Sequence, residues 1–105
     1  MWNVLGKNLS MAEGDYGVPL PILVVGAELT ASDSLKFIFK SKVNGSAILE
    51  KEYVPVDNAL TLELTEAETA LFSVGQYVYS VDWYQSGVFN CNIIPMGILR
   101  VVDKA

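Results

Sequence analysis

Histidine is absent from the 105 residues of this sequence, and cysteine occurs only once. Histidine is the commonest general base and the commonest metal-binding side chain in proteins. The sequence also has no serine or cysteine beside a base, no Gly-rich phosphate-binding loop and no EF-hand spacing for calcium. We therefore expect a protein that is not an enzyme and that uses neither a metal nor another cofactor.

Basic residues are scarce as well. Twelve aspartate and glutamate residues outnumber seven lysine and arginine residues, which gives a net charge of −5. Binding to nucleic acid needs clustered basic residues, and only the three lysines between positions 36 and 42 lie close together. The longest apolar run, residues 18–25, is far too short to cross a bilayer, and the first fifteen residues lack the pattern of a signal peptide. We expect no nucleic-acid partner, no membrane partner and no export signal.

Two further features of the sequence could be interpreted as reactive groups, but a structural role is favoured for both. The single cysteine, Cys91, lies among apolar residues, where a buried inert thiol is favoured over a reactive one. Acidic pairs at positions 13/15, 50/52 and 66/68 have the spacing of acid–base dyads. They fall at a predicted turn, on a strand face and at a helix start, so we interpret them as solvated charges.

The sequence is rich in alternating apolar and polar residues, the pattern of half-buried strands. Residues 9–13 form a possible first strand, and Leu35, Phe37 and Phe39 share one face of a later one. Asn44-Gly45 then predicts a hairpin with a two-residue type I′ turn. The two prolines of residues 18–25 lie two positions apart, so both lack an amide donor on the same edge of the strand. This predicts a strand that is paired only along its other edge.

The next two predicted strands differ in how clearly their apolar and polar residues alternate. In residues 47–54 we expect Leu49 and Tyr53 to point inward and Lys51 to lie at the rim. Residues 59–64 alternate cleanly. The leucines at 60, 62 and 64 point inward, and the residues at 61 and 63 point outward.

Residues 64–83 join a helix to a strand. Thr65 and Glu68 have the spacing of a capping box, which predicts a short helix over about residues 66–72. Its expected buried face consists of Ala67, Ala70, Leu71 and Phe72. From Gly75 onward the aromatic face of a strand follows, formed by Tyr77, Tyr79, Val81 and Trp83. Pro95 is expected to break the strand after that.

Seven to eight short strands with turns at this spacing predict an all-β, immunoglobulin-like β-sandwich with one short helix. We expect residues 1–105 to form one domain, with residues 1–8 as a candidate N-terminal arm. Alternation sends Tyr16, Tyr84 and Phe89 away from the predicted core, and Trp2 lies in the N-terminal segment. These four aromatics are candidate interface residues, with Trp2 either docking on a neighbour or packing on its own domain. Exposed aromatics also suit sugar stacking, which we rank below an assembly contact.

The order of these landmarks resembles a known family. In chain order they are Gly14-Asp15, Asp33, Asn44-Gly45, residues 64–81, Gly87 and residues 97–102. The chain resembles the immunoglobulin-like structural domains of tail and baseplate regions in phages and prophages of Gram-positive bacteria. It is similar to the N-terminal domain of the baseplate upper protein. The matching motif positions are Leu64, Thr65, Thr69, Phe72, Gly75, Tyr77, Tyr79 and Val81, with Leu71 one place before the family's second leucine.

The resemblance covers about residues 9–102 and carries no catalytic residues. It implies a non-enzymatic virion structural protein of the tail or baseplate type, assembled in the bacterial host cytoplasm. Such a module works by protein–protein docking onto other phage structural proteins, and it is a candidate homo-oligomer. Baseplate upper proteins continue past this domain, whereas this sequence ends at Ala105, so tail, head–tail and decoration roles all stay open. The alternative function is a carbohydrate-binding β-sandwich module that uses exposed aromatics.

Overall fold

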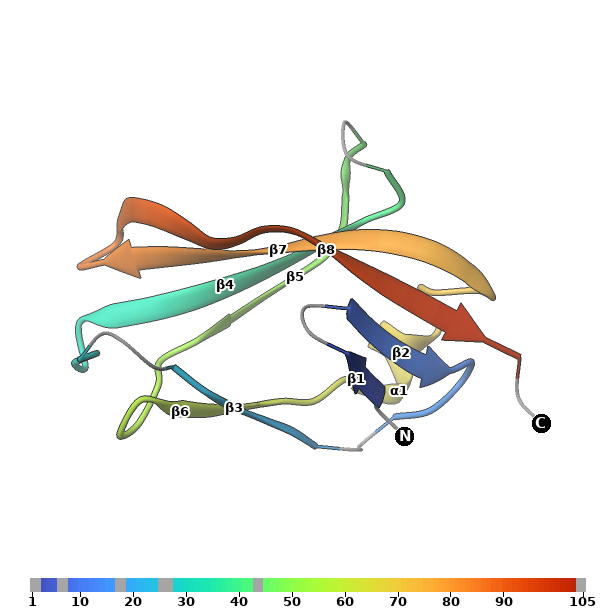
Figure 1. Cartoon of the computed structure of the whole chain (residues 1–105), viewed down its shortest axis with the longest axis horizontal. Coiled ribbons are helices and arrows are strands. Elements are labelled where there is room, and N and C mark those ends of the chain that lie inside the picture. The colour runs from blue at the N-terminus through green and yellow to red at the C-terminus, as the bar shows by residue number, and fades with distance from the viewer. Residues whose placement is uncertain (1–2, 6–7, 17–18, 25–27, 43–44, 104–105) are drawn as a thin grey trace.

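The computed structural model describes residues 3–5, 8–16, 19–24, 28–42 and 45–103. Over these residues the chain forms eight strands and one short helix. They are β1 (Asn3–Leu5), β2 (Asn8–Ala12), β3 (Leu20–Leu23), β4 (Asp33–Lys40), β5 (Ala47–Tyr53), β6 (Ala59–Leu62), α1 (Glu66–Thr69), β7 (Gly75–Gln85) and β8 (Val88–Val102). A six-stranded sheet has the order β1-β2-β8-β7-β4-β5, and β3 and β6 form a second sheet. Figure 1 shows the two sheets as two layers, which confirms the predicted all-β sandwich.

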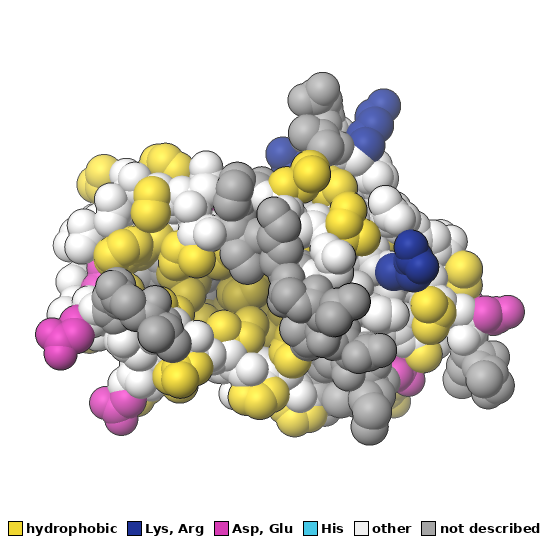
Figure 2. Space-filling model, in the orientation of Figure 1, with side chains coloured by type: hydrophobic (Ala, Val, Ile, Leu, Met, Phe, Trp, Pro, Cys, Tyr) yellow, Lys and Arg dark blue, Asp and Glu magenta, His cyan; other side chains and the backbone are white. Residues whose placement is uncertain are grey.

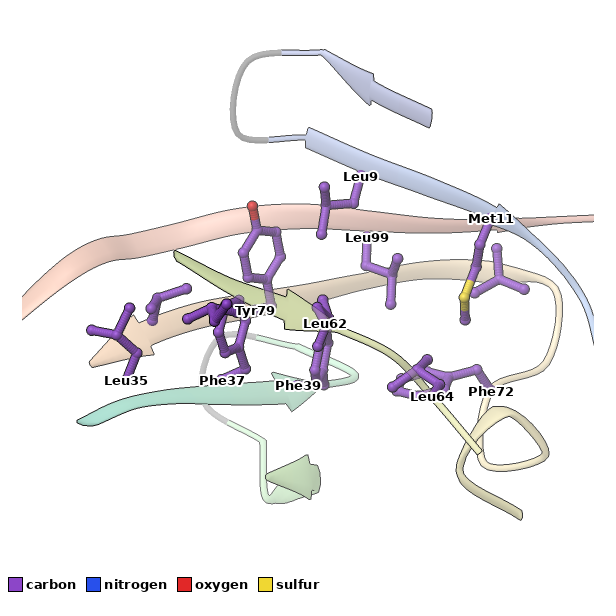
Figure 3. Packing of buried hydrophobic residues seen from close by; sticks show 13 residues of the cluster. Leu9, Met11, Leu35, Phe37, Phe39, Leu62, Leu64, Phe72, Tyr79 and Leu99 are labelled. Atoms are coloured by element: carbon purple, nitrogen blue, oxygen red, sulfur yellow. The ribbon is translucent and has the colours of Figure 1, made fainter. Parts of the chain in front are cut away.

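The core lies between the layers and follows the predicted alternation. On β4 every second side chain is buried, beginning with Asp33 and continuing through Leu35, Phe37 and Phe39. The second layer contributes three inward leucines, as expected from its pattern. The buried apolar set is Leu9, Met11, Leu35, Phe37, Phe39, Leu60, Leu62, Leu64, Phe72, Tyr79, Val81, Leu99 and Val101. Figure 3 shows how these side chains from both layers meet.

The small sheet confirms the interpretation of the two prolines. β3 pairs only with β6, antiparallel, with Pro21 opposite Thr61. The amide of Val24 donates to the carbonyl of Asn58 at 2.8 Å, so amides at even positions of this segment point toward β6. Pro19 and Pro21 occupy odd positions, and their missing donors therefore face the open edge.

Strand β8 is longer than predicted, because Pro95 does not break it. β8 continues from Val88 to Val102. Its register against β7 shifts near the proline: Val81 pairs with Ile94, and Tyr79 pairs with Gly97. Two residues of β8 thus lie opposite one of β7, which is a bulge. A bulge tolerates proline, because the extra residue is not required to donate to the ladder.

The type I′ hairpin turn also lies at a different place. A turn on Asn44-Gly45 would pair Phe39 with Glu50, whereas Phe39 pairs with Leu49. The β4–β5 hairpin is therefore confirmed, and the placement of its turn on Asn44-Gly45 is wrong; the Gly45 amide donates to the Lys42 carbonyl at 2.9 Å, and Asn44 lies outside the described residues. Asp57-Asn58 has positive φ at both positions, at 53° and 61°, and so does Ser86-Gly87. The residues that flank Asp57-Asn58, Val56 and Ala59, exchange both backbone hydrogen bonds across it.

This turn gives opposite expectations for its two residues. Glycine carries no Cβ penalty at positive φ, so Asp57→Gly is expected to stabilise the fold by about 0.5–1 kcal/mol. Asn58→Gly is expected to destabilise it by about 1 kcal/mol, because the Asn58 side chain accepts from the Leu29 amide at 2.8 Å and donates to the Val24 carbonyl at 3.3 Å. Thermal melting followed by circular dichroism measures both variants. A lower melting temperature for Asp57→Gly would contradict the argument.

The helix is shorter than expected, and a different face is buried. The capping box is confirmed: Thr65 Oγ1 accepts from the Glu68 amide, and the Glu68 carboxylate accepts from the Thr65 amide. After Thr69 the helix tightens into a 3₁₀-type turn, in which an amide donates to the carbonyl three residues earlier. The Phe72 amide, for example, donates to the Thr69 carbonyl. This tightening turns Phe72 inward, whereas Leu71 is 50% exposed.

The buried helix face therefore differs from the predicted one. Ala67 and Ala70 are exposed, like Leu71, and only Phe72 of the four expected residues is buried. Thr69 is the other buried residue, and its hydroxyl lies 2.8 Å from the Asp15 carbonyl oxygen. A polar residue fills a core position here because its hydroxyl has backbone acceptors.

Candidate interaction surface

We call the far end of the β7–β8 hairpin, residues 82–96, the arm; its β7 strand is also paired with β4, from Asp82 opposite Lys36 to Gln85 opposite Asp33. Its turn is Ser86-Gly87, with φ of 51° and 80°, between the paired residues Gln85 and Val88. The Ser86 amide donates to the Ser32 carbonyl at 2.7 Å and so ties the tip to the loop before β4. In Figure 1 the arm lies at the opposite end of the molecule from α1.

Two predicted interface residues meet on the arm. Tyr84 and Phe89 are direct partners across the β7–β8 ladder. Their ring centroids lie 5.8 Å apart with an interplanar angle of 76°, an edge-to-face pair. Tyr84 is half-buried and Phe89 is 50% exposed. The expectation that both point away from the core is confirmed.

Charged residues of β4 and β5 border this aromatic pair. The Lys36 ammonium lies 5.9 Å from the centre of the Tyr84 ring and 2.9 Å from Glu50. The hydrogen bond to Glu50 raises the pKa of Lys36 above its ordinary value. Ser34 donates to Glu52 at 2.8 Å. The 50/52 acidic pair thus has partners on β4, in addition to its contact with solvent.

Beneath the arm, Trp83 is held by a buried carboxylate. The indole nitrogen donates to Asp33 Oδ1 at 3.0 Å, and the Thr30 amide donates to Asp33 Oδ2 at 2.7 Å. Asp33 itself is only 3% exposed. The backbone hydrogen bond from Thr30, followed by the bond from Trp83, holds the pKa of the Asp33 carboxyl below its ordinary value. Trp83 packs against the core, as expected for the aromatic face of this strand.

This carboxylate predicts a loss of stability in acid. The pKa of Asp33 is lower in the folded chain than in the unfolded chain, so its ionised form stabilises the fold above pH of about 4. That contribution is lost as the pH falls through the folded pKa. Asp33→Asn is therefore expected to melt below the wild type at pH 7, with a difference that shrinks toward pH 3. Melting curves at both pH values measure it. A difference that does not change with pH would contradict the assignment.

The β8 half of the arm is uncharged and carries several exposed apolar side chains. From Ser86 to Ile98 the sequence has no charged residue. The exposed large apolar side chains of this stretch are Val88 at 68%, Phe89 at 50%, Ile93 at 40% and Met96 at 44%. Figure 2 shows hydrophobic side chains gathered over this end of the molecule. The absence of charged residues from Ser86 to Ile98 is the sequence signal that could have identified this patch.

Cys91 lies within the same stretch and is exposed, so the expectation of a buried thiol is wrong. Its apolar neighbours in sequence are themselves about half exposed. Strand β2 pairs with β8 only from Leu99 to Val102. Among the described residues, no strand covers that side of β8 from Val88 to Ile98, and the surroundings of Cys91 therefore stay open.

The remaining predicted interface residues lie apart from the arm. Tyr16 is 55% exposed and follows the turn after β2. Its neighbour Asp15 contacts Thr69 of α1, at the end of the molecule opposite the arm. Trp2 lies outside the described residues. The structure thus brings together Tyr84 and Phe89, and it separates Tyr16 from them.

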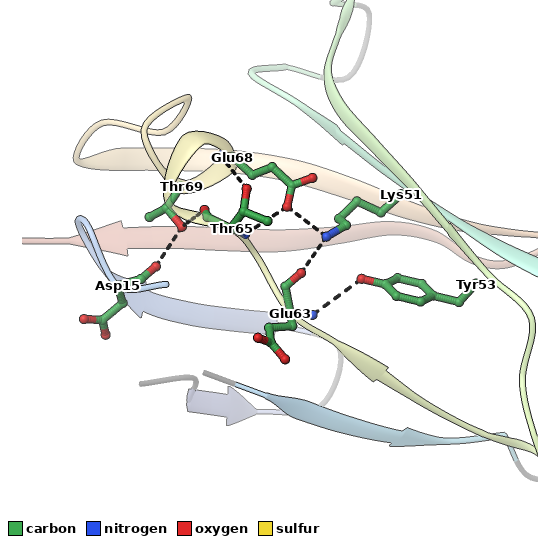
Figure 4. A network of polar contacts seen from close by, with 7 residues as sticks. All are labelled: Asp15, Lys51, Tyr53, Glu63, Thr65, Glu68 and Thr69. Carbon is green, nitrogen blue, oxygen red and sulfur yellow. Dashed lines mark hydrogen bonds and ion pairs between the residues drawn. The ribbon is translucent and has the colours of Figure 1, made fainter. Parts of the chain in front are cut away.

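A second polar cluster is structural. Lys51 donates to Glu68 of the capping box at 2.8 Å and to the Glu63 carbonyl at 2.6 Å (Figure 4). Burial disfavours the charge of Lys51 and is the largest single influence, but the hydrogen bond to Glu68 acts together with the charges of Glu68 and Tyr53 and raises the Lys51 pKa above its ordinary value. Lys51 was expected at the rim, yet its side chain is only 18% exposed. It connects β5 to the helix cap, and Glu68 is an ion-pair partner in addition to its contact with solvent.

No protein-family model matches the chain, and no curated protein matches it either. Within the described part of the chain, no three His, Cys, Asp or Glu residues are placed to hold a metal ion. In the same part, no helix has the length and apolar character needed to span a membrane.

Proposed function

We propose that this protein is a non-enzymatic structural module that docks onto other proteins through the arm. The observation that carries the proposal is the gathering of exposed apolar side chains, centred on the Tyr84–Phe89 pair, along an uncharged strand segment. Single exposed apolar residues are normal on protein surfaces, whereas a contiguous group with aromatic members is typical of an interface. The pairing of β7 with both β4 and β8 at this place favours a preformed contact.

The particular role that we propose is that of a virion structural protein of a phage or prophage, of the tail or baseplate type. This part rests on the family resemblance of residues 64–81 and their neighbours. Its partners would be other phage structural proteins, and its location the virion, after assembly in the bacterial host cytoplasm.

Peptide mass spectrometry on purified phage particles tests the virion role. The particles are induced from the cell that carries the gene, and the protein is quantified against the major structural proteins. Many copies in each particle would support the proposal. Absence from intact particles would contradict the virion role and leave the docking surface to be explained by another assembly.

A carbohydrate-binding module is the second candidate. The half-buried Tyr84 ring lies beside Lys36 and next to the polar residues Ser34 and Glu52, which supplies both an aromatic contact and hydrogen-bonding groups. Binding to a glycan array that is lost in Tyr84→Ala and Phe89→Ala would favour it. Tyr16→Ala is the matched control, because Tyr16 is an exposed aromatic at the other end of the molecule. Equal binding by all three variants would contradict a sugar site on the arm.

A further inference from the structure

We propose that the partner of the arm is a second copy of this chain, bound antiparallel along β8 between Val88 and Met96. The inference rests on the proposed docking function and names the partner for that surface. It follows from the charge of the chain, from the order of residues in the segment, and from a comparison of the free edges of the large sheet.

Charge favours this segment as the place where two copies meet. Each copy has a net charge of −5, so most approaches of one copy to another are repulsive. The thirteen residues from Ser86 to Ile98 carry no charge. Two copies can bring these segments together without burying like charges, and the apolar side chains that lose contact with water favour the contact.

The order of residues in the segment suits a two-fold axis. Around Cys91 the sequence is Val-Phe-Asn-Cys-Asn-Ile-Ile, which has the same pattern of residue types in both directions. In an antiparallel arrangement centred on Cys91, Phe89 of one copy lies against Ile93 of the other, and asparagine lies against asparagine. An isologous dimer requires this kind of self-complementarity.

The large sheet ends in β1 on one side and in β5 on the other, and the free edge of β5 does not have this self-complementarity. β5 carries Glu50, Lys51 and Glu52 at its centre. Antiparallel pairing about Lys51 would place Glu50 against Glu52 and lysine against lysine, which is repulsive. A second copy is therefore compatible with β8 and not with β5.

The contact between copies is made by side chains rather than by a long backbone ladder. The register between β7 and β8 shifts at three places, between Tyr79 and Val81, between Val81 and Asp82, and between Trp83 and Tyr84. Each shift is a bulge that bends β8, so a backbone ladder on its other side is confined to a short stretch around Cys91. The residues that then lose solvent-accessible area when two copies associate are Phe89, Ile93 and Met96.

Sedimentation of the full chain over a range of concentrations tests the proposal. We expect a monomer–dimer equilibrium, with a dissociation constant at least about tenfold weaker in Phe89→Lys and in Ile93→Lys. Matched controls are Leu71→Lys, since Leu71 and Phe89 are both 50% exposed, and Val102→Lys, at 39% against 40% for Ile93. The controls are expected to keep the dissociation constant of the wild type. Circular dichroism checks that each variant is folded.

Cysteine oxidation provides the second measurement. If the two-fold axis passes near Cys91, mild oxidation gives a disulfide-linked dimer of the wild type, and Phe89→Lys slows its formation. A dimer without this crosslink overturns the antiparallel arrangement. A mass that stays monomeric at about 1 mM, or a dimer equally weakened by Phe89→Lys and Leu71→Lys, overturns the second copy as partner. A monomer that is nevertheless abundant in phage particles would overturn this inference alone and support the proposed function.

Discussion

Phe39→Ala is expected to lower the free energy of unfolding by about 3–5 kcal/mol, the largest effect of any single substitution considered for this chain. Phe39 is completely buried, one residue before the end of β4. Its ring centre lies 5.7 Å from that of Phe72 and 6.0 Å from that of Tyr79, so the residue joins the helix connection to the large sheet. Alanine leaves a cavity among rings that cannot collapse into it. Domains of this size have a total stability of about 5–15 kcal/mol, so the loss is a large share.

Urea denaturation followed by tryptophan fluorescence measures the change. The midpoint should fall while the slope with denaturant stays near that of the wild type. Phe89→Ala is the matched control, because the same side chain is removed from a half-exposed site. A loss of about 1 kcal/mol or less for Phe39→Ala would contradict the packing, since buried phenylalanines do not contribute so little.

Phe72→Ala is expected to have the second largest effect, about 3 kcal/mol or more. Phe72 is 2% exposed and makes edge-to-face contacts with Phe39 and Tyr77, the latter at 5.1 Å between centroids. The adjacent Leu71 is 50% exposed, so Leu71→Ala should change stability by no more than about 0.5 kcal/mol.

This pair of neighbours tests where the helix ends. An α-helix continued to position 72 would have buried both side chains, and the two substitutions would then cost similar amounts. The same urea titration compares them side by side. Similar losses for Phe72→Ala and Leu71→Ala would contradict the tightened turn after Thr69.

The strands with clean alternation could be predicted from the sequence, because one buried face fixes which residues point inward. Phe39 on β4 and Leu62 on β6 are examples, and the capping box at Thr65 is another, since its spacing is local. What could not be predicted depends on contacts between distant segments. Asn44-Gly45 has the stronger local preference for a type I′ turn, yet Asp57-Asn58 adopts it, because the Asn58 side chain bonds to Leu29 and Val24.

For the candidate site, too, the local pattern could be predicted from the sequence, whereas contacts between distant segments could not. Ser86-Gly87 signals a two-residue turn, and such a turn places Tyr84 opposite Phe89. A regular ladder from that turn would place Cys91 opposite Asp82, but the register shift moves it opposite Trp83. The sequence pattern alone does not mark such a bulge. The exposure of Cys91 was missed because it depends on which strand covers β8, and β2 pairs with β8 only from Leu99 to Val102.

The parallel pairing of β2 with β8 has a consequence for the order of synthesis. Leu9 and Met11 lie near the start of the described chain, and their ladder partners, Leu99 to Val102, lie near its end. A ribosome therefore releases one half of this pair long before it makes the other. Until then two core side chains lack their ladder partners, so this part of the sheet cannot close before residues 99–102 have emerged.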